Sequence, residues 1–230
     1  MTELLRQMTI NVRFQRNGRT LYSGTTYAGF VTILNGVKEG KFAFSLNQRL
    51  TNAESGAAVK NLLKWAVGLI EGSPITVVTR RLFEEEANTY EEARDFLSRV
   101  PLVSPLYLIV GGVSGNQGCV ITRSVDNSLQ PQTLQVSSVK PTWILQTNYD
   151  HWEAPPADDD RRTPGNLCMR NSLSMSFAAL FNVLTTKPVL LQEVTYTSLM
   201  DAKLGKLETY VRMCPYPCSP GPVHSEIGGL

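Results

Sequence analysis

The sequence predicts an α+β fold in which an antiparallel sheet is covered by helices. Three observations support it. Segments of alternating apolar and polar residues, joined by tight turns, fill the first fifty positions; helical periodicity follows from residue 54; and strand-like runs resume at residue 106. Runs of strands interrupted by blocks of helices are typical of layered α+β proteins rather than of regular βαβ folds. With 230 residues, 42% of them hydrophobic, the chain can bury the core of one domain.

The first fifty residues have the pattern of a β-meander. Apolar side chains alternate with polar ones at Met8, Ile10, Val12 and Phe14. Asn17-Gly18 predicts a tight turn before a return strand from Leu21, because both residues tolerate the positive φ angles of a two-residue hairpin loop. The pattern repeats in residues 30–34, a turn at Asn35-Gly36, and residues 41–46.

The next segment predicts a layer of helices. In residues 54–70 one helical face is apolar, formed by Ala58, Leu62, Trp65, Ala66 and Leu69. A second helix is predicted over residues 75–86, where Glu84-Glu85-Glu86 is interpreted as a solvated face. A third opens at Asn88 or Thr89 and carries Glu91 and Glu92 in its first turn, where the helix dipole favours acids.

Strands dominate the remainder. Residues 106–110 and 119–122 flank a Gly-rich turn, and two further β-like runs cover residues 133–139 and 142–146. The last of these runs is predicted to carry Asn148 at its end. A helix is indicated by Met175, Ala178, Ala179 and Val183, and strands at residues 194–199 and 207–211 complete the pattern.

Charge and hydropathy exclude some classes of protein. The formal net charge is +2 and the basic residues are dispersed, which argues against a nucleic-acid partner. No apolar run approaches the roughly 20 residues that span a bilayer. The first residues contain an acid and amides where a signal peptide would be apolar, so we expect no export signal in the given sequence.

The cysteines allow two interpretations. Cys214 and Cys218 enclose a short proline-stiffened loop. Zinc is the competing interpretation, but the spacing is unusual for zinc ligands and the only histidines are His151 and His224. A local disulfide, which favours an oxidising compartment, is therefore the prediction, and no metal or cofactor is expected.

The segment from Ile144 to Pro164 holds the candidate site. An Asn148 amide at a strand end could donate to an oxyanion, and Arg161 beside Asp158-Asp159-Asp160 could orient a carboxylate or form an ion pair within its loop. A strand, a turn and a solvated loop leading into a helix would explain the same residues. No serine or cysteine nucleophile with a histidine base is supported, and Cys119 is interpreted as a small buried hydrophobe.

The chain resembles the acid ceramidase and N-acylethanolamine acid amidase family, which are N-terminal-nucleophile hydrolases, and is most similar to the acid ceramidase β subunit. Nine ordered motifs carry the resemblance: Phe14-Gln-Arg-Asn17, Thr26-Tyr-Ala-Gly-Phe30, Phe44-Ser-Leu-Asn47, Tyr107-Leu-Ile-Val-Gly-Gly112, Gly118-Cys-Val-Ile-Thr-Arg123, Thr147-Asn-Tyr-Asp-His-Trp152, Asp159-Asp-Arg-Arg-Thr-Pro164, Leu184-Thr-Thr-Lys-Pro-Val189 and Cys214-Pro-Tyr-Pro-Cys218.

The resemblance implies a four-layer αββα sandwich and a lysosomal amidase that cleaves the N-acyl bond of ceramide or an N-acylethanolamine. Its nucleophile would be an amino-terminal cysteine exposed by self-cleavage, with its own α-amino group as base. Asn148 matches the oxyanion-hole asparagine, and Arg161 matches the arginine that completes the site. Gln48 stands where relatives carry glutamate, which removes a charge but leaves any role of the backbone N–H intact.

The resemblance also implies an expectation about the N-terminus. Leu4-Leu-Arg-Gln-Met-Thr matches sequence that follows the family's nucleophile, so that cysteine would precede Met1 and the given chain would be an inactive, N-terminally incomplete β subunit. Residues 1–213 would form the partial domain, and residues 214–230 a disulfide loop and tail. Cys168 would pair with an α subunit, and a saposin-type activator is a candidate partner. The alternative is a catalytically dead lipid-binding or regulatory paralogue.

Overall fold

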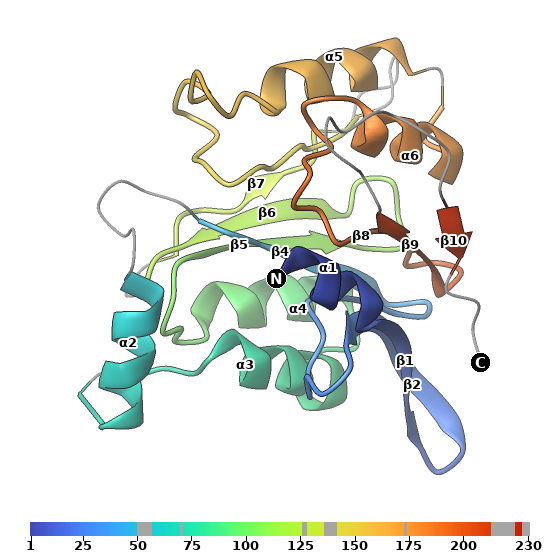
Figure 1. Ribbon diagram of the computed structural model, residues 1–230. Helices are drawn as coiled ribbons and strands as arrows, with labels where there is room; N and C mark the ends of the chain where they lie inside the picture. The colour runs from blue at the N-terminus through green and yellow to red at the C-terminus, as the bar shows by residue number, and fades with distance from the viewer. Residues whose placement is uncertain are drawn as a thin grey trace.

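The computed structural model describes residues 1–49, 57–69, 71–125, 128–135, 142–172, 174–212 and 224–226 (Figure 1). The helices are α1 Thr2–Gln7, α2 Ala57–Ala66, α3 Ile75–Arg81, the π-helical η1 Leu82–Glu86, α4 Tyr90–Arg99, α5 Arg162–Asn171 and α6 Phe177–Thr185. The strands are β1 Thr9–Arg16, β2 Arg19–Tyr27, β3 Asn35–Lys38, β4 Phe42–Gln48, β5 Leu106–Gly111, β6 Gly118–Arg123, β7 Gln132–Thr133, β8 Tyr196–Asp201, β9 Lys206–Arg212 and β10 His224–Glu226.

These elements form four layers. A seven-stranded antiparallel sheet, in the sequential order β1 to β7, has α3, η1 and α4 on one face (Figure 1). A three-stranded sheet, β10-β9-β8, lies on the other side, where β8 and β9 contact β2 and β3. Helices α5 and α6 form the outermost layer, and α6 packs on β8. The predicted αββα arrangement is therefore present.

The main core lies between the large sheet and its helices. The ring centroid of Phe83, in η1, lies 4.7 Å from that of Tyr22, 5.0 Å from Phe42 and 6.3 Å from Phe44. All four aromatic side chains are fully buried. Because successive strand residues point to opposite faces, alternate residues of β4 and β5 fill this core and the intervening ones point to the other face of the large sheet.

The two sheets meet through polar side chains. The Oγ1 atom of Thr25 lies 2.7 Å from that of Thr209 and 3.1 Å from the hydroxyl of Ser198. Nearby, the Tyr196 hydroxyl donates to Oδ1 of Asn35 over 2.8 Å. Buried hydroxyls of this kind stabilise an interface only when they are hydrogen-bonded, so these hydroxyl contacts specify how the sheets align.

The predicted hairpin at Asn17-Gly18 is confirmed, but the turn predicted at Asn35-Gly36 is wrong. Asn17 and Gly18 have φ angles of 52° and 76°, whereas residues 35 and 36 open β3, and the reversal occurs at Gly40, with φ of 67°. A Cβ on Gly36 would lie 2.5 Å from Cδ1 of Ile33. Glycine is therefore required at position 36 for close packing rather than for a turn.

The helical block is confirmed with different boundaries. Helix α2 ends at Ala66, before the predicted end at residue 70, and several of its apolar side chains are exposed, including Leu62 and Leu63. Residues 75–86 form α3 followed by η1. Helix α4 begins after Thr89, whose side chain accepts from the backbone N–H of Glu92 as an N-cap. Helices α1 and α5 were not predicted.

The predicted strand over residues 142–146 is wrong. These residues have no regular secondary structure, and β7 is limited to Gln132–Thr133, while residues 136–141 lie outside the described part of the chain. Asn148 therefore follows an irregular segment instead of a strand end. Helix α6 and strands β8 and β9 confirm the remaining predictions for this half of the chain, and β10 adds a short strand beside β9.

Candidate active site

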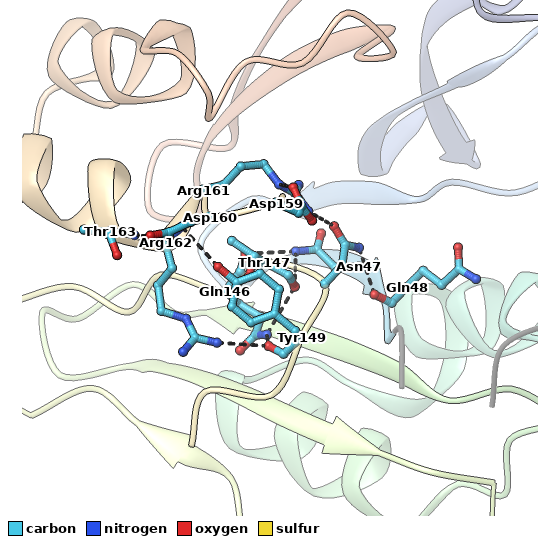
Figure 2. Close-up of polar contacts among 11 residues, drawn as sticks. Asn47, Gln48, Gln146, Thr147, Tyr149, Asp159, Asp160, Arg161, Arg162 and Thr163 are labelled. Atoms are coloured by element: carbon cyan, nitrogen blue, oxygen red, sulfur yellow. Dashed lines mark hydrogen bonds and ion pairs between the residues drawn. The ribbon is translucent and has the colours of Figure 1, made fainter. Parts of the chain in front are cut away.

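The segment around Asn148 is held by side chains in place of a strand partner. The Asn47 amide donates to the carbonyls of Gln146 and Thr147, at 3.0 and 3.3 Å (Figure 2). The Gln146 amide donates to the carbonyls of Thr147 and Tyr149, at 3.1 and 3.0 Å. These bonds satisfy carbonyls that a β-ladder would otherwise pair, so the segment keeps one defined path without regular structure.

Arg162 holds the same segment from the side of α5. Its guanidinium donates to four backbone carbonyls within residues 149–153, those of Tyr149, Asp150, His151 and Glu153. The shortest of these bonds is 2.7 Å, to the Asp150 carbonyl. The guanidinium also stacks on the Tyr149 ring, 4.3 Å from its centroid. A single arginine thereby links the start of α5 to residues 149–153.

The structure brings the three predicted site residues together. Nδ2 of Asn148 donates to the backbone carbonyl of Gln48 over 2.8 Å, and Oδ1 of Asn148 accepts from Nη2 of Arg161 over 2.9 Å. Arginine can only donate, so it fixes which end of the amide faces it. The amide nitrogen carries two hydrogens, and the bond to Gln48 uses one of them. Among the described residues the second hydrogen has no partner, so it can bind an incoming oxygen.

Arg161 forms the ion pair within its loop that was considered for it. Its Nε and Nη2 atoms also bind the two carboxylate oxygens of Asp159, at 2.6 and 2.7 Å, in a bidentate pair (Figure 2). Asp160 serves another purpose, since its carboxylate accepts from the backbone N–H of Thr163 in the first turn of α5. That bond lowers the pKa of Asp160. Asp159 thus pairs with Arg161, and Asp160 binds the first turn of α5.

Gln48 contributes its main chain. The side chain is exposed and points away from Asn47 and Arg161 (Figure 2). Its carbonyl is the group that accepts from Asn148. Replacement of glutamate by glutamine at this position therefore leaves the contact with Asn148 intact.

The sequence interpretation missed a buried ion pair beside these residues. Nε and Nη2 of Arg49 donate to the two carboxylate oxygens of Asp150, at 2.8 and 2.7 Å, and the Tyr107 hydroxyl donates to Oδ1 of Asp150 over 2.6 Å. Burial raises the pKa of the Asp150 carboxyl, but hydrogen bonds from Arg49 and Tyr107 outweigh it and the pKa lies below its ordinary value. The only local signals were an aspartate two positions after Asn148 and an arginine directly after a strand.

The described cysteines lie away from Asn148. Cys119 is buried in the core between the large sheet and its helices, where burial raises the pKa of the thiol. Cys168 lies in α5, with its sulfur 3.4 Å from the Thr186 hydroxyl. The predicted disulfide of Cys214 and Cys218 falls outside the described residues. Among the residues that are described, no cluster of His, Cys, Asp or Glu could hold a metal ion, and no helix has the length and apolarity to cross a membrane.

Comparisons with known proteins identify the relatives of this arrangement. A Caenorhabditis elegans N-acylethanolamine-hydrolyzing acid amidase ortholog of known structure superimposes with a TM-score of 0.74 and 31% identity, over 88% of this chain and 83% of that one. The chain belongs to the acid ceramidase and N-acylethanolamine acid amidase family. Its layers are accordingly those of the N-terminal-nucleophile hydrolase fold.

Curated acid ceramidases are similar along nearly the whole chain. The protein from Heterocephalus glaber is 40% identical and that from Homo sapiens 38% identical, each over 220 residues and 95% of this chain. The chain spans about half the length of these relatives, 54% in both cases. No protein-family profile matches the chain.

Proposed function

We propose that the protein hydrolyses the N-acyl amide bond of a lipid amide, ceramide or an N-acylethanolamine, to a fatty acid and an amine. The geometry of Asn148 is the observation that carries the proposal. Its Oδ1 is bound by Arg161 and one amide hydrogen by the Gln48 carbonyl, so the remaining N–H has a fixed direction. A preorganised donor of this kind stabilises the oxyanion of a tetrahedral intermediate in acyl transfer.

The proposed nucleophile is the amino-terminal cysteine implied by the family resemblance. Its α-amino group takes the thiol proton, and the thiolate attacks the amide carbon to form a tetrahedral intermediate. Collapse breaks the C–N bond, the amine leaves with the proton, and water then hydrolyses the thioester to release the fatty acid. Because Cys119 is in the core and Cys168 in α5, the proposed nucleophile is contributed from outside the described residues.

The setting proposed for this reaction is the lysosome, where the protein would pair with an α subunit and could use a saposin-type activator. Cys168 is the proposed link to the α subunit, since its side chain is partly exposed and forms no disulfide within the described residues. Cys214 and Cys218 are the proposed local disulfide. These proposals follow from kinship with acid ceramidases, which match along 95% of this chain.

The test is a substrate panel at acidic pH with the protein expressed from its complete coding sequence. Ceramide, an N-acylethanolamine and a fatty acyl ester of the same chain length are incubated separately, and the released fatty acid and amine are quantified by mass spectrometry. We expect release from at least one amide, reduced roughly 10²–10³-fold in Asn148→Ala. Binding of these lipids without hydrolysis would instead support the catalytically dead paralogue.

A further inference from the structure

The carboxylate of Asp150 lies at the point where the Asn148 segment meets the large sheet. Its side chain is 4% exposed and accepts three hydrogen bonds: two from Arg49, directly after β4, and one from Tyr107, in β5. A carboxylate that accepts a bidentate arginine pair together with a tyrosine hydroxyl is fixed in direction as well as in position. Asp150 is therefore a rigid point two residues from Asn148.

The sheet places these partners on one face. Asn47 and Tyr107 are register partners in the β4–β5 ladder, and Arg49 follows Asn47 by two positions. The neighbours of Tyr107 on either side, Leu106 and Leu108, belong to the helix-facing core. Alternation therefore directs Tyr107 to the opposite face. On that face Asn47 binds the backbone carbonyls just before Asn148, and Tyr107 binds the carboxylate of Asp150.

Asn148 depends on these contacts because its own segment lacks a ladder. It is only partly buried, and its bond to the Gln48 carbonyl requires residues 147–150 to stay beside the end of β4. Displacement of a catalytic group by about 1 Å can lower a rate about 10²-fold. Loss of the hydrogen bonds to Asp150 would therefore lower the rate of reaction by shifting Asn148, although Asn148 itself would still be present.

We propose that Asp150, bound by Arg49 and Tyr107, is a positioning residue that sets the direction of the Asn148 amide. The inference rests on the proposed amidase reaction and extends it to residues that do not touch the substrate. The ion pair joins positions 101 residues apart in the sequence, so it ties the second half of the site to the sheet built by the first half. Arg162 restrains the same backbone from the side of α5, whereas Asp150 ties it to Arg49, directly after β4, and to Tyr107 of β5.

The test compares Tyr107→Phe and Asp150→Asn with a matched control, Asp95→Asn. The control makes the same chemical change in the solvent-accessible Arg94–Asp95 pair on α4. Steady-state kinetics are measured on the amide that the wild-type protein hydrolyses best, together with hydrogen exchange of the backbone amides of residues 147–151. We expect kcat to fall about 10-fold or more in both site variants, with KM within about twofold of wild type. The amides of residues 147–151 should exchange faster in both variants and not in the control.

Two results would overturn the inference. One is wild-type kcat in Tyr107→Phe together with unchanged exchange at residues 147–151; this variant decides the matter if Asp150→Asn does not fold. The other is a parallel rise in KM and fall in kcat that the control shares, which a general loss of stability would produce. If the wild-type protein hydrolyses no amide, the proposed amidase activity is refuted. The hydrogen-exchange measurement alone then decides whether Asp150 holds residues 147–151 in place.

Discussion

Arg161 is predicted to act through Asn148, and this coupling can be measured. Arg161→Met removes the 2.9 Å bond to Oδ1 of Asn148 and frees the amide to rotate. A hydrogen bond to a charged group contributes about 1.5–3 kcal/mol, which corresponds to a roughly 10- to 160-fold loss of kcat. Loss of Asn148 itself should cost about 2.7–4 kcal/mol of transition-state stabilisation.

A double-mutant cycle on the lipid amide tests this expectation. We expect Arg161→Met to lower kcat strongly in the wild-type background and only slightly in Asn148→Ala, giving a coupling free energy of about 1.5–3 kcal/mol. Arg94→Met is the matched control, because it makes the same substitution in the solvent-accessible Arg94–Asp95 pair on α4. Additive losses in the cycle would refute the account of Arg161 as the residue that orients the amide.

Three further predictions follow from single contacts. Gln48→Ala should leave kcat within about twofold, because only the carbonyl at this position is used and the carbonyl remains; kinetics on the lipid amide measure it. Gly36→Ala should lower the free energy of unfolding by about 1–3 kcal/mol in urea, because the new methyl group would lie 2.5 Å from a buried isoleucine carbon. Arg123→Met should destabilise by about 1–3 kcal/mol, because two carbonyls at the end of α4 lose their donors, at 2.6 and 2.7 Å.

Matched controls separate these effects from general ones. Gly115→Ala is the control for Gly36→Ala, because nothing lies within 4 Å of the added methyl group. Arg99→Met, at an exposed position in the last turn of α4, is the control for Arg123→Met. Equal unfolding midpoints for Gly36→Ala and Gly115→Ala would contradict the packing argument. Equal midpoints for Arg123→Met and Arg99→Met would contradict the role of Arg123 at the end of α4. A large loss of kcat in Gln48→Ala would assign the side chain a role that the structure does not give it.

Local patterns in the sequence predicted most of the fold. Alternation and the Asn17-Gly18 turn identified the first hairpin, and Thr89 with its two following glutamates marked the start of α4. The prediction failed at Asn35-Gly36 because the same dipeptide serves close packing as readily as a turn, and the deciding neighbour, Ile33, is recognisable only in three dimensions. Turn chemistry alone therefore could not place β3.

The candidate site was predicted in part. The resemblance identified Asn148 and Arg161, and their mutual bond spans 13 residues of one segment. The contacts of Asp150 with Arg49 and Tyr107 could not be predicted, because these partners precede it by 101 and 43 residues in the sequence. The strand assigned before Asn148 failed for a related reason: its carbonyls are satisfied by distant side chains, above all Asn47, and no sequence periodicity reports such bonds.

The most direct test of the central claim is the effect of Asn148→Ala on the separate steps of lipid amide hydrolysis. Substrate affinity is measured by equilibrium binding, and turnover is measured by single-turnover kinetics at acidic pH. An oxyanion donor acts mainly in the transition state, so we expect turnover to fall roughly 10²–10³-fold while affinity stays within about twofold. Equal losses of turnover and affinity would place Asn148 in substrate binding and remove it from the oxyanion site.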